Sequence, residues 1–140
     1  MILVKKTDWN ILLDEFIAKN RFKGFSWGSW DCCKFSNALI KEITGEDLIP
    51  KTLKWKDETS AMESIKKYGK TLLKSIDKAC KSKKIAVIDK MYVSKGDLVV
   101  YKEETELVGI CDGMNILSPS EDGIEVKPTE LIIKAWRIDG

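Results

Sequence analysis

The chain has 140 residues and contains no histidine. Imidazole is the commonest general base, the commonest proton shuttle and the commonest metal ligand in proteins. Any catalysis by this chain must therefore rely on other groups. Arginine is also scarce, since only Arg21 and Arg137 carry guanidinium groups. Few side chains are thus suited to bidentate contacts with phosphate or guanine.

The chain also lacks a clear excess of charge of one sign. Twenty-four Lys and Arg residues face 22 Asp and Glu residues, which gives a formal net charge of +2. A balance of this kind creates no long-range field that would attract a nucleic acid. We therefore expect no nucleic-acid partner.

Long apolar runs are absent as well. No run approaches the roughly 18 residues of a membrane-spanning helix, and the opening segment 1–6 is too short for the apolar core of a signal peptide. We expect no membrane span and synthesis in the cytoplasm.

The cysteines do not follow a metal-binding pattern. The four residues Cys32, Cys33, Cys80 and Cys111 show no Cys-x-x-Cys spacing, the arrangement with which one turn presents two thiolates to zinc. We expect no metal site, no cofactor and four reduced thiols. Cys80 and Cys111 fall on apolar faces, which favours ordinary core positions for both.

Length and composition predict one globular domain covering residues 1–140. The first part, about residues 7–84, has the apolar spacing of amphipathic helices. Predicted helices run from Trp9, with Thr7 or Asp8 as cap, and from about Asp31 to Thr44, ending at Gly45. Ser60 and Glu63 suggest a capping box that opens a third helix ending at Gly69, and a fourth helix follows from Leu72.

The second part, about residues 85–140, consists of short apolar runs separated by turn residues, a pattern typical of antiparallel strands. Helices followed by strands predict an α+β fold, with the N-terminal helices packed on a C-terminal antiparallel sheet or partial barrel. The predicted strands are 98–101, 107–111, 114–117, 124–126 and 135–138.

Residues 25–33, Phe-Ser-Trp-Gly-Ser-Trp-Asp-Cys-Cys, are the most informative segment. They place a thiol at the predicted start of a helix, where unpaired backbone N–H groups and the helix dipole stabilise a thiolate. The alternative is that Cys32 and Cys33 are ordinary small buried residues. If the helix start activates Cys32, its thiol should react faster with an alkylating agent than those of Cys80 and Cys111.

Three segments together resemble the papain-like NlpC family of cell-wall cysteine peptidases and amidases, and in particular a short branch found among phage tail genes. The family's Tyr-x-Trp-Gly element before an Asp-Cys pair is set against residues 25–28, which begin with Phe, and residues 31–32. Its Gly-Asp-Leu-Val strand opening matches residues 96–99. Its His-Val-Gly-Ile strand, ending near a glycine, is set against residues 107–110 and Gly113. The resemblance spans about residues 25–136.

The resemblance implies a papain-like (NlpC-like) fold with Cys32 as nucleophile. Leu107 stands where the family has its histidine base, and the third, orienting position falls near Asn115 to Ser118. The residues around the thiol would line the cleft: Phe25, Trp27, Gly28, Trp30, Asp31 and Cys33.

With the base replaced, we interpret the chain as a catalytically degenerate NlpC-like domain that serves as a structural virion protein of a phage tail, at its tip or hub. Its expected partners are other tail proteins and, as a further possibility, peptidoglycan. The alternative function is an active phage cysteine peptidase or amidase that cleaves peptidoglycan peptide bonds through Cys32. A third, weaker alternative is a free binding module in the host cytoplasm, with the old cleft as its ligand pocket.

Overall fold

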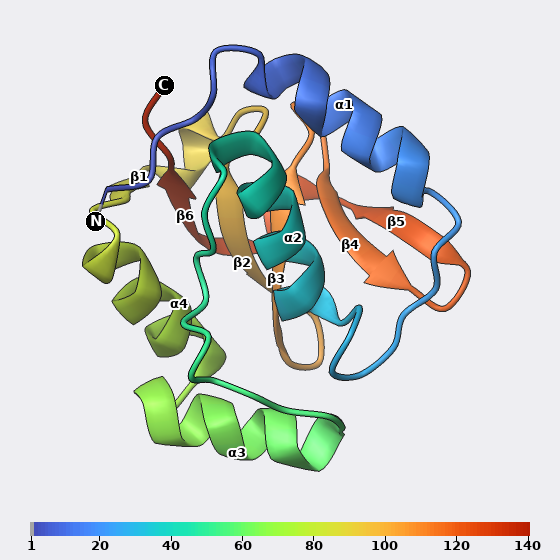
Figure 1. Ribbon diagram of the computed structural model, residues 1–140, viewed down its shortest axis with the longest axis vertical. Helices are drawn as coiled ribbons and strands as arrows, with labels where there is room; N and C mark the ends of the chain where they lie inside the picture. Colours follow the sequence, from blue (N-terminus) through green and yellow to red (C-terminus); the bar gives the residue numbers. More distant parts are fainter. Residues whose placement is uncertain (1) are drawn as a thin grey trace.

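The computed structural model describes residues 2–140 and has an α+β architecture. Four helices come first in the chain and pack against a six-stranded, open antiparallel sheet (Figure 1). The strand order is β1-β6-β2-β3-β4-β5, so the last strand of the chain lies between the first two. The predicted succession of helices and strands is confirmed.

The helices are α1 (Trp9–Asn20), α2 (Cys32–Thr44), α3 (Glu58–Gly69) and α4 (Leu72–Ser82). The strands are β1 (Ala86–Ile88), β2 (Leu98–Lys102), β3 (Glu106–Cys111), β4 (Ile116–Ser120), β5 (Gly123–Lys127) and β6 (Ile132–Arg137). Two short 3-10 turns, residues 90–92 and 129–131, precede β2 and β6.

Helix α2 is the central helix of the fold. It lies across β3 and β4 and also contacts α1, and it buries Phe35, Leu39 and Ile43 completely (Figure 1). As predicted, it ends at Gly45, which adopts a left-handed φ of 89° and donates its N–H to the Lys41 carbonyl. A residue with a side chain would be strained in that conformation.

The predicted start of the third helix is wrong by three residues. Helix α3 begins at Glu58, and Asp57 rather than Ser60 is its N-cap. A capping box is present, but Asp57 and Ser60 form it instead of Ser60 and Glu63. Both residue pairs have the same three-residue spacing, so the pattern does not distinguish them.

The strand predictions need three corrections. β6 begins at Ile132, three residues before the predicted start at residue 135, and ends at Arg137. β1 was not predicted, because three residues followed by polar turns give too little alternation to detect. β4 begins at Ile116, not at residue 114, because Asp112 closes the β3–β4 turn by accepting hydrogen bonds from the N–H groups of Met114 and Asn115. Met114 is consequently 81% exposed.

The sheet is covered on both faces. Successive side chains of β2 and β3 point to opposite faces of the sheet. Val100 and Val108 face the helices, whereas Val99 and Tyr101 belong to a second cluster on the other face. The chain ends meet at the edge of the helical layer, where the Lys5 N–H donates to the Asp139 carbonyl. None of the helices within residues 2–140 has the length and apolarity that a membrane crossing requires.

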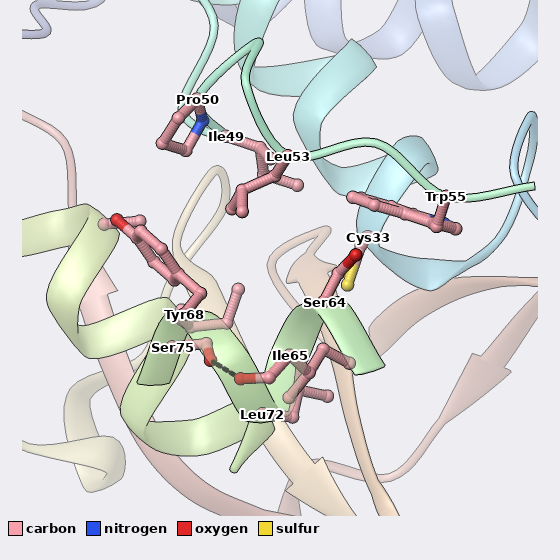
Figure 2. Close-up of a pocket in the computed structure, with 12 residues that line it drawn as sticks. Cys33, Ile49, Pro50, Leu53, Trp55, Ser64, Ile65, Tyr68, Leu72 and Ser75 are labelled. Carbon is pink, nitrogen blue, oxygen red and sulfur yellow. Dashed lines mark hydrogen bonds between the residues drawn. The ribbon is translucent and has the colours of Figure 1, made fainter. Parts of the chain in front are cut away.

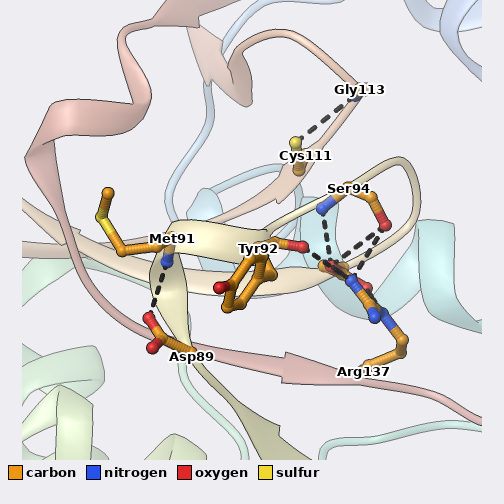
Figure 3. Close-up of polar contacts among 8 residues, drawn as sticks. Asp89, Met91, Tyr92, Ser94, Cys111, Gly113 and Arg137 are labelled. Carbon is orange, nitrogen blue, oxygen red and sulfur yellow. Dashed lines mark hydrogen bonds and ion pairs between the residues drawn. The ribbon is translucent and has the colours of Figure 1, made fainter.

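Asp97, from the Gly-Asp-Leu-Val segment, anchors the start of β2 and is fully buried. Its carboxylate accepts hydrogen bonds from the Ser94 N–H and from Nε and Nη2 of Arg137 on β6. Arg137 also donates to the Tyr92 carbonyl and the Ser94 hydroxyl (Figure 3). The carboxylate raises the pKa of the Arg137 guanidinium, and the ion pair ties the start of β2 to β6.

Replacing Arg137 by Met should lower the free energy of unfolding by about 2 to 3 kcal/mol, because it leaves the buried Asp97 carboxylate without its main partner. Urea denaturation followed by tryptophan fluorescence measures this loss. Lys127→Met is the control, since Lys127 pairs with Glu103 at the surface and should cost less than about 1 kcal/mol. Equal losses in the two variants would contradict the role given to the Asp97–Arg137 pair.

Candidate functional site

Cys32 is the first residue of α2, as the sequence predicted. Asp31 precedes it as N-cap, with an extended backbone and a side chain that accepts a hydrogen bond from the Lys34 N–H at 2.9 Å. The cap fixes where the helix begins. The Cys32 sulfur therefore lies at the positive end of the helix dipole.

The Asp31 carboxylate does more than cap the helix. It is 1% exposed, and its Oδ2 accepts hydrogen bonds from the Gly28 N–H at 2.9 Å and from the Trp55 Nε1–H at 2.6 Å. These contacts join the loop before α2, the start of α2 and the segment that leads into α3. One side chain therefore sets the geometry around the thiol.

Strand β3 lies directly beside Cys32. The Cys33 thiol donates a hydrogen bond to the Cys32 sulfur, and the Val108 backbone N–H of β3 donates another. Led by the Cys33 hydrogen bond, these contacts lower the pKa of the Cys32 thiol despite opposing effects of burial and of the Asp31 charge. The site thus favours a thiolate at Cys32.

Cys33 has the opposite character. Donation of its hydrogen bond to Cys32, together with burial, raises the pKa of the Cys33 thiol well above its ordinary value. Cys33 also lines a small apolar pocket of about 40 Å³ with Leu53, Ile65 and Tyr68 (Figure 2). Of the two neighbouring thiols, Cys32 is thus the one that more readily forms a thiolate, while Cys33 keeps its proton.

Cys32 opens into a groove of about 520 Å³. One wall comes from the loop before α2, with Phe25 and Trp27 in an edge-to-face contact at 5.0 Å between ring centroids. Helix α3 and the start of α4 form the opposite wall, which includes Met62, Ile65 and Leu72. The start of β3 closes one side. A concave, mainly apolar site of this volume is typical of a ligand pocket.

Leu107 lines this groove together with Cys32, so the strand register expected from the sequence places the two residues at one site. Glu106 lies beside it, and its Oε1 accepts a hydrogen bond from the Leu73 N–H at the start of α4. Position 107, where the resemblance would place a base, has an aliphatic side chain, which packs against the second cluster around Val99 and Tyr101.

Asn115 and Ser118, the two residues expected near the third, orienting position, lie in different elements. Asn115 lies in the β3–β4 turn, beyond the end of β3 that is remote from Leu107. Ser118 is buried on β4 and interacts with the phenol of Tyr101. Burial raises the pKa of Tyr101 to about 12, and the charge of Cys32 adds to the rise. Tyr101 was not predicted, because its position in an apolar strand gave no signal.

Among the expected cleft residues, Phe25, Trp27, Asp31 and Cys33 do line the groove, while Gly28 and Trp30 do not. Trp30 is 5% exposed and packs on Phe16 and Phe35, because the turn between the Ser26 and Trp30 bridge partners directs it into the core. Gly28, with a φ of 82°, lies against the backbone of Lys56, where a Cβ would come within 2.8 Å.

Sequence reasoning missed the wall formed by Trp55 and the α3–α4 segment. Trp55 is held by Asp31 and by the Lys34 ammonium, which lies 4.4 Å from its ring centroid. Its wide separation from Cys32 along the chain left no local pattern to detect. Among residues 2–140 no three His, Cys, Asp or Glu side chains converge as a metal site. Cys80 and Cys111 are buried, and burial raises the pKa of each thiol.

The fold and site define a class of protein: an α+β domain with a thiol at a helix N-terminus, facing the first residues of an antiparallel strand across an apolar groove. The chain belongs to the family described as a domain of unknown function, DUF6950, whose model matches residues 4–138. A search of curated proteins found no match.

Substituting Asp31 by Ala should destabilise the fold by about 2 to 4 kcal/mol, because the change removes a helix cap and leaves the Trp55 N–H without its partner. Urea denaturation gives the loss. The same substitution at Asp57, which caps the exposed start of α3, should cost less. A loss at Asp31 no greater than that at Asp57 would show that the three contacts do not act together.

Native Cys32 should react with iodoacetamide at lower pH than an unperturbed cysteine, with a rate midpoint below about 8.5. The sign follows from the lowered pKa: the thiolate fraction persists as the pH falls toward that value. Peptide mass spectrometry of samples labelled across the pH range resolves the individual sites. Cys33→Ala should move the midpoint upward. Equal labelling rates for Cys32, Cys80 and Cys111 would contradict activation of Cys32.

Proposed function

We propose that this protein is a catalytically degenerate NlpC-like domain that acts as a structural component of a phage tail, at its tip or hub. Its open groove would bind a neighbouring tail protein or peptide-containing material of the bacterial wall. The assignment to a tail rests on the resemblance of residues 25–32, 96–99 and 107–113 to the phage branch of that family. The proposed loss of catalysis rests on the groove itself.

The supporting observation is the aliphatic Leu107 beside a hydrogen-bonded Cys32 sulfur. Cleavage of a peptide bond by a thiol requires an acid that protonates the departing amine, and positioned proton transfer of this kind contributes on the order of 10² to 10⁴ in rate. Two of the three carboxylates that line the groove have structural hydrogen bonds, Asp31 to α2 and Trp55, and Glu106 to the start of α4; the third is Glu58.

The alternative is an active cysteine peptidase or amidase that cleaves peptidoglycan peptide bonds through Cys32. The lowered pKa of the Cys32 thiol and the open groove favour this function, since both are properties of a working nucleophile. The two functions differ in turnover and can be separated directly.

Purified protein incubated with peptidoglycan should release no new primary amines above the level of a Cys32→Ala sample. A fluorogenic amine assay over several hours measures the release. Amine release that is lost in Cys32→Ala but kept in Cys111→Ala would establish the peptidase. Particles of the phage that encodes the chain should contain it by mass spectrometry, and its absence from them would contradict the role in the tail.

Introducing histidine with Leu107→His should accelerate alkylation of Cys32 at pH 6, because an imidazolium beside the sulfur lowers the thiol pKa further. Each unit of decrease raises the thiolate fraction about tenfold below the pKa. The control is Val126→His, on the exposed part of β5. No difference between the two variants would contradict the placement of residue 107 beside Cys32.

A further inference from the structure

The groove beside Cys32 combines a thiol with mainly apolar walls. Phe25, Trp27 and Met62 are partly exposed along it, and Ile65 and Leu72 continue into the small pocket beneath Cys33. Burial of apolar surface is the main favourable energy that such walls offer a ligand. They suit an aliphatic chain better than a polar glycan or a charged peptide.

Which substrates Cys32 can cleave depends on the group that leaves the substrate. An amine cannot depart from a tetrahedral intermediate without a proton, whereas a thiol of ordinary pKa, about 8.5, departs as its own anion. Attack of a thiolate on a thioester therefore needs no general acid, as attack on a disulfide needs none. A helix-start thiolate without a base is suited to thioester exchange.

Two lysines stand along the groove, which is also lined by the carboxylates of Asp31, Glu58 and Glu106. Lys66 and Lys70 line it and are exposed, and within residues 2–140 neither forms an ion pair. They begin a stretch, residues 66–84, with eight lysines and one acidic residue, Asp77. A local excess of one sign attracts a ligand of the opposite sign, and lysine is a common phosphate partner.

We propose that Cys32 accepts an acyl group from the thioester of a small phosphate-bearing thiol, with the acyl chain in the apolar groove and the phosphates at Lys66 and Lys70. This activity goes beyond the structural role proposed above and does not depend on it.

The step balances without an oxidant or water. The Cys32 thiol first loses its proton to solvent. Its sulfur then forms a bond to the thioester carbonyl carbon, and the bond from that carbon to the carrier sulfur breaks. The electron pair leaves with the carrier thiolate, which takes up a proton from solvent. Because no base activates a water molecule beside Leu107, the acyl group stays on Cys32.

The test is incubation of the purified protein with octanoyl-coenzyme A, followed by intact-mass and peptide mass spectrometry. One octanoyl group should appear on Cys32, persist for hours at neutral pH, and be removed by hydroxylamine as a thioester is. Cys111→Ala should be acylated like the wild type, and Cys32→Ala should not. No adduct, an adduct on another residue, or continuous release of free octanoate would overturn the proposal.

Two further comparisons test the groove and the lysines separately. Acetyl-coenzyme A should react at least tenfold more slowly than the octanoyl compound, since its short chain leaves the groove unfilled. Replacing both Lys66 and Lys70 by Gln should slow acylation by octanoyl-coenzyme A at least tenfold at low salt, but leave acylation by the uncharged octanoyl-N-acetylcysteamine unchanged.

The matched control for the lysines is Lys90→Gln, outside the groove. Equal rates for the acetyl and octanoyl compounds would contradict binding of the acyl chain in the apolar groove. An equal effect of the Lys66 and Lys70 changes on both octanoyl donors, or on neither, would contradict the phosphate contacts. The amine-release assay on peptidoglycan is independent of all these outcomes, so failure here is distinguishable from failure of the structural role.

Discussion

The carboxylate of Asp31 is the interaction on which the site depends. It accepts hydrogen bonds from the Gly28, Lys34 and Trp55 N–H groups. These bonds join the loop before α2, the first turn of α2 and the segment that leads into α3. Because the carboxylate is almost fully buried, each lost contact would leave a polar group without water to replace it. The groove thus owes the positions of one wall and of the nucleophile to a single residue.

The two neighbouring cysteines at the start of α2 have the same side chain but opposite shifts in thiol pKa. Cys32 receives hydrogen bonds from the Cys33 thiol and from the Val108 N–H, which stabilise its negative charge. Cys33 donates its own proton and lines an apolar pocket, which destabilises a charge there. The pKa values of the two thiols therefore move in opposite directions, and one sulfur becomes reactive because the other does not ionise.

Both proposals start from a Cys32 thiolate to which no base is assigned. Leu107, which stands where the resemblance would place the base, is aliphatic and lines the groove with Cys32, and the carboxylates of Asp31 and Glu106 accept hydrogen bonds from the backbone or from Trp55. Chemistry that needs an acid is disfavoured in such a groove, while binding and exchange between sulfurs remain accessible. The membership in a family of unknown function leaves these roles to be decided by the site.

The sequence by itself determined the elements with strong local signals. The apolar spacing of residues 35–43 and the glycine at position 45 defined α2 and its end, and Asp31 before two cysteines defined the thiol at its start. These features depend on neighbours within a turn or two, so they can be read locally. The resemblance of three separate segments also set Leu107 at the family's base position, and both Leu107 and Cys32 line the groove.

Tertiary structure decided the rest. Trp30 and Trp27 have similar sequence surroundings, yet Trp30 is buried against Phe16 and Phe35 while Trp27 borders the groove. Trp55 and the α3–α4 wall reach the site through contacts between segments far apart in the chain, and no periodicity records such contacts. Local patterns reflect backbone preference and amphipathicity, whereas a site is assembled by packing, which only the folded chain specifies.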